Sequence, residues 1–432
     1  MNFQANNPTF IIKTLGCKVN QYESEIMREN LLKNGYAESS DKEFAEFYII
    51  NSCTVTHRAD RDARRLIRHF NKINPDAGII VAGCYAESDN DRKILATLPG
   101  VMHILKNKEK DKVGDVLKSH NKDEPLNFKS ALRQFKDHDR VFIKIQDGCN
   151  HGCSYCKVAL VRGASRSRSE NEILDEVRNV LGKGCKEIVL TGICLGAWGM
   201  DLEKPLDISY ILKKIKNIDG DYRIRLSSIE PAYVTGELID LVYSSDNICK
   251  HFHIPLQSGD DRILRMMQRG YNTKKFEALL KKIRKKMPNA GFTTDLMIGF
   301  PGEDDKIFGM TYKFIKKIKP SRIHIFSYSE REGTLAFNFK NIINNATIKN
   351  RINLIKKLSY NLHMDFVFKL KKNPQKVLIE SKKDKYSQLL TGYTDTYVKV
   401  FIDGPDTLLN SFVKVKIMDI NQRGIFASPA QP

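Results

Sequence analysis

Several features that would place this chain in a membrane or outside the cell are missing from its sequence. No apolar run approaches the roughly 20 residues needed to cross a bilayer. Residues 1–10 lack the basic stretch and apolar core of a secretory signal, so we expect a cytoplasmic protein. Hydrophobic residues make up 41% and charged residues 28% of the chain, which excludes a disordered or membrane class.

Acidic residues are also scarce, since 51 Asp and Glu stand against 71 Lys and Arg, a formal net charge of +20. Such a surplus favours polyanionic partners, because contacts between basic side chains and phosphates release counterions. Charge alone does not separate an RNA- or DNA-binding protein from one whose surface is merely basic.

The chain has 432 residues, enough for two to four domains with ample core. In a reducing compartment its nine cysteines are not expected to form disulfides. Six of them lie in loop-like, glycine-flanked contexts that suit metal or cluster ligation.

The N-terminal part alternates short apolar runs with helical stretches. We predict strands at residues 10–15, 47–51 and 79–82 and helices near 23–33 and 58–73, the second helix basic and amphipathic. This βαβαβ order predicts a parallel sheet with right-handed crossovers. The three strands run directly into Cys17, Cys53 and Cys84. Because the carboxyl ends of parallel strands share one edge, the three thiols can meet there.

The central part predicts a second parallel α/β unit after a polar stretch, residues 110–140, that we interpret as a linker or loosely packed helix. Six strands are expected, at residues 141–146, 187–190, 223–227, 251–256, 293–298 and 322–327. Helical patterns separate them, which predicts an open partial (β/α)6 barrel, two units short of a closed one. The carboxyl-end loops of such a sheet form its active face.

The tail is β-rich, with strands expected at residues 377–380, 397–402 and 413–418 and a turn at 403–405. Residues 341–432 hold 15 basic and 7 acidic side chains, a net of +8. A small basic β-barrel is typical of domains that bind looped or single-stranded RNA. The alternative is a merely structural cap.

The most specific motif is the loop CNHGCSYC at residues 149–156, directly after a strand. Its three thiols, Cys149, Cys153 and Cys156, can converge on zinc or an iron-sulfur cluster. A cubane held by three thiolates keeps one iron open for a substrate. A structural zinc site or chance spacing is the alternative, and His151 is interpreted as a spacer.

The cysteine loop and the following RGASRSR at residues 162–168 resemble the radical S-adenosylmethionine (SAM) superfamily, specifically its methylthiotransferases. TLGCKVNQYESE at 14–25, NSCTVT at 51–56 and GCY at 83–85 resemble the N-terminal domain of that family. These phrases are most similar to the MtaB-type branch, which acts on threonylcarbamoyladenosine beside the tRNA anticodon. The tail resembles the family's RNA-binding TRAM domain. Two departures, Ala159 for a common proline and Trp198 for a common tyrosine, are expected to be tolerated.

The resemblance implies two 4Fe-4S clusters, SAM, tRNA presenting its anticodon loop, and a reducing electron donor. The cluster at Cys149, Cys153 and Cys156 would generate the radical that takes hydrogen from C2 of the adenine. The auxiliary cluster at Cys17, Cys53 and Cys84 would hold the sulfur, and a second SAM would supply the methyl group. The target base must be exposed, as it is in a loop. SAM contacts are expected at Thr191, Gly192, Ser228, Glu230, Gly299 and Gly302.

Other conspicuous residues carry weaker predictions. Arg162, Arg166 and Arg168 are candidates for the cofactor carboxylate or RNA phosphate, although such charge runs are usually solvated. Cys185 and Cys249 are expected to be buried or incidental thiols. Cys194 follows a strand end, and its role is left open.

We therefore expect an α/β enzyme with a βαβ parallel-sheet domain at residues 1–135 and a radical SAM partial barrel at 136–335. A connecting helical segment at 336–370 and a TRAM-like β-barrel at 371–432 would follow. Rival functions within the family are methylthiolation of isopentenyladenosine in tRNA or of a ribosomal protein aspartate. A rival of another class is a non-catalytic, zinc-containing RNA-binding protein.

Overall fold

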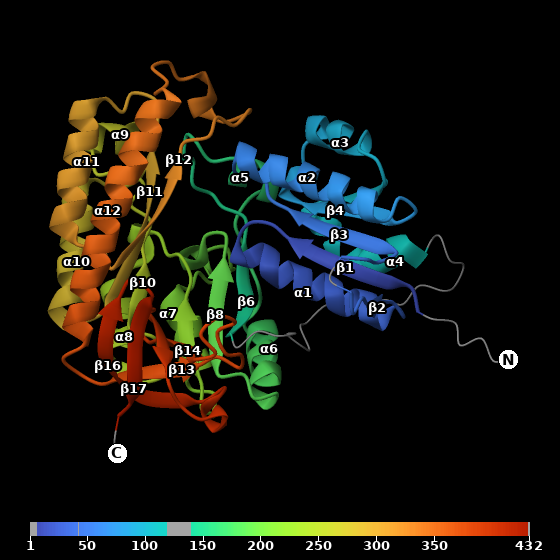
Figure 1. Ribbon diagram of the computed structural model, residues 1–432. Coiled ribbons are helices and arrows are strands. Elements are labelled where there is room, and N and C mark those ends of the chain that lie inside the picture. The colour runs from blue at the N-terminus through green and yellow to red at the C-terminus, as the bar shows by residue number, and fades with distance from the viewer. Residues whose placement is uncertain (1–6, 42, 119–139, 431–432) are drawn as a thin grey trace.

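The structure, a computed structural model, describes residues 7–41, 43–118 and 140–430. It contains three domains. Figure 1 shows an N-terminal sheet domain on the right, a curled sheet with helices outside it, and a small β-barrel below. The expected α/β class and all three parts of the architecture are confirmed. None of the described helices is apolar over a length that would span a membrane.

The N-terminal sheet is parallel throughout, with strand order β2-β1-β3-β4-β5. Its strands are β1 (Thr9–Thr14), β2 (Ala37–Glu38), β3 (Phe47–Ser52), β4 (Gly78–Gly83) and β5 (Val101–Leu105). Its helices are α1 (Lys18–Lys33), α2 (His57–Ile73), α3 (Asp89–Ala96) and α4 (Val113–Lys118). The three predicted strands are confirmed, and the two edge strands were missed.

Alternating residues of the buried central strands separate the two faces of this sheet. Ile49 and Ile80 pack with Leu31 of α1 on one face. Tyr48 and Val81 pack on the other face in the cluster that includes residues of α2. Because both faces are covered, the strands are apolar along their whole length, as parallel strands usually are.

The prediction of a linker or loosely packed helix at residues 110–140 was wrong for residues 113–118, which form a well-packed helix. Helix α4 is packed against the sheet domain, with Val113 fully buried and Leu117 1% exposed. Val113 and Leu117 are four residues apart, which places both side chains on one face of the helix. The rest of that segment, residues 119–139, lies outside the described part of the chain.

The partial barrel has the six predicted parallel strands in sequential order. They are β6 (Arg140–Asp147), β8 (Glu187–Gly192), β9 (Arg223–Leu226), β10 (His251–His253), β11 (Gly291–Ile298) and β12 (Arg322–Ser327). A bridge between Ser228 and His253 joins the β9 and β10 sides of the curl. Strand β10 is shorter than predicted, and a two-residue strand β7 (Arg166–Ser167) that pairs antiparallel with β6 was missed.

The helices of the partial barrel lie outside its sheet (Figure 1). They are α5 (Val158–Arg162), α6 (Glu170–Gly182), α7 (Ile208–Lys216), α8 (Gly236–Ser244), α9 (Asp261–Met266), α10 (Thr273–Lys286) and α11 (Asp305–Ile318). The long helix α12 (Asn345–Leu370) packs against β12, with Ile355 and Leu358 in the same apolar core as Ile323.

The C-terminal domain is a closed five-stranded barrel in the order β13-β14-β15-β17-β16. Its strands are β13 (Gln375–Ile379), β14 (Leu390–Thr394), β15 (Lys399–Ile402), β16 (Phe412–Asn421) and β17 (Gly424–Pro429). The small barrel was predicted, but two of its strands were not. Val377, Val400 and Val415 are fully buried in its interior.

The C-terminal barrel docks on the amino ends of the central strands through charged groups. Glu187 at the start of β8 pairs with Arg225 at 2.8 Å, and also with Arg223. Arg223 in turn pairs with Asp395 of the β14–β15 turn at 2.8 Å. Burial alone would raise the pKa of Glu187, but Arg225 and Arg223 outweigh it and hold the pKa at about 2. This ionic contact holds the C-terminal barrel against the partial barrel.

Candidate active site

The three N-terminal cysteines line one cavity of about 660 Å³. Cys17 is the N-cap residue of α1, Cys53 follows β3, and Cys84 follows β4. The cavity also reaches Thr191 and Gly192 at the carboxyl end of β8. The prediction that these thiols meet at one sheet edge agrees with this geometry, and that edge faces the carboxyl edge of the partial barrel.

Residues of the cysteine motifs hold the Cys17 and Cys53 loops together. The Asn20 side-chain amide donates to the Leu15 carbonyl at 2.7 Å and to the Ser52 carbonyl at 2.9 Å. Gly16 has a φ of +99°, and a Cβ there would lie 2.7 Å from Cβ of Cys53. Only glycine therefore allows the Cys17 loop to approach Cys53 this closely.

Burial is the main influence on the pKa of two of these thiols, Cys17 and Cys53. Burial raises the pKa of Cys53 to about 12 and also raises that of Cys17, against the opposing charge of Arg162. Cys84 accepts a hydrogen bond at Sγ from Arg162 Nε at 3.3 Å. Since a soft metal binds thiolate rather than thiol, ligation here would displace protons.

The second cysteine set lies in the loop between β6 and α5. The Ser154 amide donates to the Met267 carbonyl at 3.1 Å, which ties the loop to the α9 end. The His151 amide approaches Cys149 Sγ at 3.4 Å, and Arg269 Nη1 donates to Cys153 Sγ at 3.1 Å. Donors aimed at sulfur are what a ligated thiolate requires around it.

Cys194, whose role the sequence left open, lies against Cys149 of this second set. A hydrogen bond with the Cys194 thiol lowers the pKa of Cys149 to about 6, while burial raises the pKa of Cys156 to about 12. Cys249 is buried, and the half-buried Cys185 donates to the Glu187 carbonyl at 3.3 Å. Neither of those two lines the cavity of the N-terminal set.

Arg162 connects the two sets, since it ends the short helix α5 that follows Cys156. Besides Cys84, its guanidinium contacts Glu23 Oε2 at 3.0 Å and the Asn20 side-chain oxygen at 2.6 Å. Glu23 is also paired with Lys144 at 3.0 Å and with Lys110. Burial would raise the pKa of Glu23, but these cations hold it well below its usual value.

The other two arginines of the 162–168 run also have protein partners. Arg168 pairs with Glu176 at 2.6 Å and donates to Tyr22 of α1 at 3.1 Å. Arg166 donates to the Arg162 and Ala164 carbonyls, both at 3.1 Å. Arg162 and Arg168 therefore join the N-terminal domain to the partial barrel, and a role for the three in binding cofactor or phosphate stays a prediction.

The six predicted SAM-contact residues are not all in one place. Thr191, Gly192 and Ser228 line the cavity of the N-terminal cysteines. Glu230 forms an ion pair with Arg269, the residue that donates to Cys153.

Gly299 and Gly302 begin the turn between β11 and α11. A Cβ at Gly299 would lie 2.5 Å from the Ile348 side chain of α12, so packing alone accounts for this glycine. Cofactor contact by these residues stays a prediction.

Buried polar atoms without partners support a cofactor site at the same edge. Among the described residues, the Ser227 hydroxyl and Gln257 Oε1 are buried and have no hydrogen-bond partner. Ser227 follows β9, and Gln257, with a φ of +68°, follows β10. Such groups are costly to bury unless something satisfies them, and a polar ligand such as SAM would do so. The residues present therefore fit both a thiolate-held cluster and a polar cofactor.

Sequence reasoning missed a polar cluster inside the partial barrel. Asp295 Oδ1 lies 3.1 Å from His253 Nε2 and 3.4 Å from His324 Nδ1. The three ligand atoms lie within 4.8 Å of one another, close enough to hold a metal ion. His253 Nδ1 contacts the Thr293 hydroxyl at 2.8 Å, which orients the ring. The signal was present, because His251, His253, Thr293 and Asp295 alternate along their strands and so share one face.

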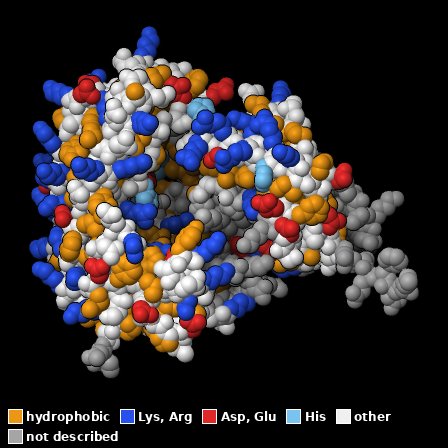
Figure 2. All heavy atoms as spheres, viewed as in Figure 1, with side chains coloured by type: hydrophobic (Ala, Val, Ile, Leu, Met, Phe, Trp, Pro, Cys, Tyr) orange, Lys and Arg blue, Asp and Glu red, His pale blue; other side chains and the backbone are white. Residues whose placement is uncertain are grey.

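Basic surfaces flank the cavity. Figure 2 shows Lys and Arg side chains gathered over α2, beside a hollow in this face. The exposed arginines of α2 are Arg58, Arg61, Arg65 and Arg68.

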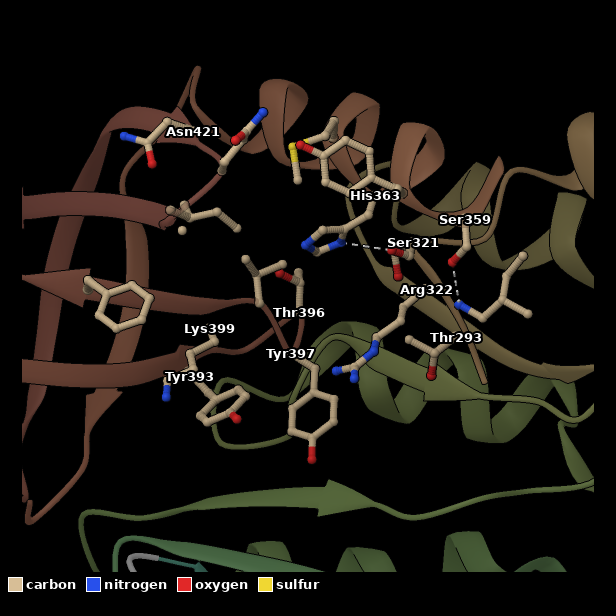
Figure 3. A pocket seen from close by; sticks show the side chains of 18 of the residues that line it. Thr293, Ser321, Arg322, Ser359, His363, Tyr393, Thr396, Tyr397, Lys399 and Asn421 are labelled. Atoms are coloured by element: carbon tan, nitrogen blue, oxygen red, sulfur yellow. Dashed lines mark hydrogen bonds between the residues drawn. The ribbon is translucent and has the colours of Figure 1, made fainter. Parts of the chain in front are cut away.

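A second cavity, of about 610 Å³, lies between α12, β12 and the C-terminal barrel (Figure 3). It combines the cations Lys356, Lys399 and Arg423 with the rings of Tyr360 and Tyr393. Basic and aromatic side chains in one groove are typical of single-stranded nucleic-acid binding.

Comparison with known families gives two matches. Residues 9–106 match the uncharacterized protein family UPF0004, and residues 143–315 match the radical SAM superfamily. These two matches cover the N-terminal sheet domain and most of the partial barrel.

Full-length relatives are also found. The threonylcarbamoyladenosine tRNA methylthiotransferases MtaB of Bacillus subtilis and Thermotoga maritima are 34% and 35% identical to this chain, over 95% and 98% of it and 94% and 97% of their own lengths. The tRNA-2-methylthio-N(6)-dimethylallyladenosine synthase of Carboxydothermus hydrogenoformans is 30% identical over 95% of this chain and 97% of its own length. Among solved structures, the radical SAM methyltransferase TsrM of Kitasatospora setae has the same fold over 74% of this chain and 73% of its own, with a TM-score of 0.54 and 12% identity.

Proposed function

This chain belongs to the radical SAM methylthiotransferase family, and on this premise we propose that it adds a methylthio group to threonylcarbamoyladenosine beside the anticodon of tRNA. As a radical SAM enzyme it uses SAM and a 4Fe-4S cluster. The observation that carries the proposal is the single cavity lined by Cys17, Cys53 and Cys84, which opens on the carboxyl edge of the partial barrel. A short helix links it to the second set of cysteines.

Cys149, Cys153 and Cys156 would hold the cluster that serves SAM. When bound there, a four-iron cluster with one open iron supplies the electron that cleaves the sulfonium of SAM. The protein's part is to orient the thiolates and to offset their charge, through Arg269 on Cys153 and the His151 amide near Cys149. Ser227 and Gln257 would bind the polar groups of the cofactor.

Cys17, Cys53 and Cys84 would hold the auxiliary cluster that carries the sulfur. Arg162 supports this assignment, because its guanidinium faces Cys84 and offsets the charge that three thiolates would gather there. The same side chain joins α5 to the N-terminal domain through Glu23. The two cysteine sets are therefore coupled to one rigid ion-pair network, which suits a reaction between groups held on each.

The tRNA would approach across the basic surfaces that flank the cavity. The exposed arginines of α2 and the groove of Figure 3 offer sites for phosphates and for unstacked bases. An anticodon loop presents its bases without the cost of opening a duplex. A cytoplasmic location and the domain boundaries at residues 135, 335 and 370 are part of the same proposal.

The choice of nucleoside rests on similarity and on chemistry. Two MtaB relatives are 34% and 35% identical to this chain, whereas the dimethylallyladenosine synthase named above is 30% identical. The cavity is lined by many polar and charged side chains, among them Lys18, Arg322 and His324. Such a lining suits a substituent with a carboxylate and hydroxyl better than an apolar isopentenyl group.

Nucleoside mass spectrometry tests the proposal. Anaerobically reconstituted enzyme is incubated with SAM, a reductant and tRNAs that carry either threonylcarbamoyladenosine or isopentenyladenosine. We expect the 2-methylthio product on the first tRNA, and none with a variant in which Cys149, Cys153 and Cys156 are all alanine. Product only on the isopentenyl nucleoside would reject the assignment, and zinc without acid-labile sulfide would favour a binding protein instead.

A further inference from the structure

The cavity of the N-terminal cysteines contains more positive charge than its acidic side chains neutralise. Its lining includes four cationic side chains, those of Lys18, Arg162, Arg225 and Arg322. Two of them are committed elsewhere, since Arg162 is paired with Glu23 and Arg225 with Glu187. The cavity holds one acidic side chain, that of Asp295.

Asp295 forms its ion-pair contacts with two histidines rather than with the other two cations. Its Oδ1 atom lies 3.1 Å from His253 Nε2 and 3.4 Å from His324 Nδ1. His253 is held in this orientation by Thr293, whose hydroxyl lies 2.8 Å from Nδ1. Both imidazoles therefore contact one oxygen of the aspartate, and among the described residues no ion pair joins Asp295 to Lys18 or Arg322.

Lys18 and Arg322 make no side-chain hydrogen bond or ion pair with any other residue in the described ranges 7–41, 43–118 and 140–430. Lys18 is the first residue of α1 and directly follows Cys17. Arg322 is the first residue of β12 and lines both the cysteine cavity and the groove of Figure 3, where its side chain extends toward Tyr397. Two cations without protein partners, Lys18 half-buried and Arg322 exposed, give this cavity a positive potential that favours an anionic ligand.

Resting on the proposed function, we propose that Lys18 and Arg322 bind the carboxylate of the threonylcarbamoyl group on N6 of the target adenine. The adenine C2 atom must face the cysteines. C6 is the other carbon bonded to N1, so its substituent points in a different direction from the C2 hydrogen. A substituent on C6 is then directed away from the cysteines into the body of the cavity. There a carboxylate gains charge-assisted hydrogen bonds. An isopentenyl group would gain no such hydrogen bonds and would remove water from the half-buried Lys18, so the pair determines specificity.

A double-mutant-type cycle tests this pairing, in which the positive charge is removed from the enzyme by substitution and the negative charge from the tRNA by esterification. The reconstituted enzyme and Arg322→Gln, Arg322→Lys and Lys18→Gln variants are compared on tRNA with the natural threonylcarbamoyl group and on tRNA with its methyl ester. Binding of anticodon stem-loops carrying each group is measured by fluorescence anisotropy. Lys282→Gln, an exposed lysine on α10, is the control for loss of one surface charge.

We expect Arg322→Gln to lower kcat/KM on the natural substrate by about 10- to 100-fold and to change it less than about threefold on the ester. Arg322→Lys should recover part of the loss. Lys18→Gln should show the same selectivity, with iron content measured because Lys18 adjoins Cys17. Equal losses on both substrates would overturn the proposal, since a nucleotide phosphate would then be the bound anion. Failure of the proposed function itself is distinct, because the unmodified enzyme would then act on neither threonylcarbamoyl form.

Discussion

Arg162 donates a hydrogen bond through Nε to Sγ of Cys84 at 3.3 Å, across 78 residues of sequence. The arginine follows the cysteine loop of the partial barrel, and the cysteine ends a strand of the N-terminal sheet. The N-terminal cysteine set is therefore completed by a residue of the partial barrel. This contact makes the relative placement of the two sets a property of the protein rather than of any bound group.

Replacing Cys149, Cys153 and Cys156 with alanine should remove about half of the cluster iron and reduce product formation at least about 100-fold. The same replacement at Cys17, Cys53 and Cys84 should remove the other half, because one cluster is proposed for each set. Iron and acid-labile sulfide are measured on anaerobic preparations. Cys185→Ser is the matched control, since that thiol donates to a backbone carbonyl and should retain all the iron. Full iron in either triple variant would contradict the assignment.

Arg162→Gln should destabilise the protein, because it leaves the buried Glu23 with only Lys110 and Lys144. We expect a loss of unfolding free energy below the roughly 3–5 kcal/mol of a fully broken buried pair. Urea unfolding of the holoenzyme measures this loss. Arg162→Lys, which keeps the charge, should lose less, and equal losses in the two variants would show that charge at residue 162 is unimportant.

Glu303 should make stability fall as pH rises toward neutrality. The side chain is 1% exposed, and burial raises its pKa to about 7 despite the Arg351 guanidinium at 2.9 Å. The native protein therefore keeps a proton up to about pH 7 that the unfolded chain already releases near pH 4.5. Unfolding releases this proton between pH 4.5 and 7, so stability falls across that range. The associated decrease is about 3 kcal/mol.

Unfolding free energies at pH 5.5, 6.5 and 7.5 test this behaviour. Glu303→Gln cannot titrate, so the stability of the natural protein minus that of the variant should decline with rising pH. A difference that stays constant across these pH values would mean that Glu303 is ionised throughout.

Tyr397→Ala should loosen the C-terminal barrel from the partial barrel. The ring lies 4.5 Å from the Arg225 guanidinium carbon and 5.1 Å from the His251 ring, and its φ of +69° places it at the tip of the β14–β15 turn. We expect a loss of about 1–3 kcal/mol in docking, seen as faster amide exchange and proteolysis of residues 371–430. Tyr397→Phe keeps the ring and should behave much like the natural protein; similar exchange in all three would refute a docking role.

Lys356, Lys399 and Arg423 should contribute to the salt dependence of tRNA binding. Replacing each with glutamine should lower the slope of log K against log salt by about 1, without changing the preference between nucleosides. Filter binding at several salt concentrations gives the slope. Lys282→Gln is the surface control, and unchanged slopes in the groove variants would place the RNA elsewhere.

The positions of both cysteine sets could be predicted because ligand chemistry and strand periodicity are local. Cys17, Cys53 and Cys84 each follow a short apolar strand, and parallel strands present their carboxyl ends on one edge. The partial barrel was predicted from the alternation of apolar strands with helical patterns along the sequence. Short edge strands such as β2 and β5 escaped prediction, since few residues carry their pattern and their pairing is supplied by neighbours.

The sequence by itself determined the placement of the six cysteines after strands, the order of the main strands and helices, and the basic surplus. Only the tertiary structure decided which charges are left without partners. Arg162 and Arg225 find carboxylates on distant segments, whereas Lys18 and Arg322 face the same cavity without one. The physical reason is that pairing of buried charges depends on which segments pack together, and residues as far apart as 18 and 322 share no local pattern that could reveal it.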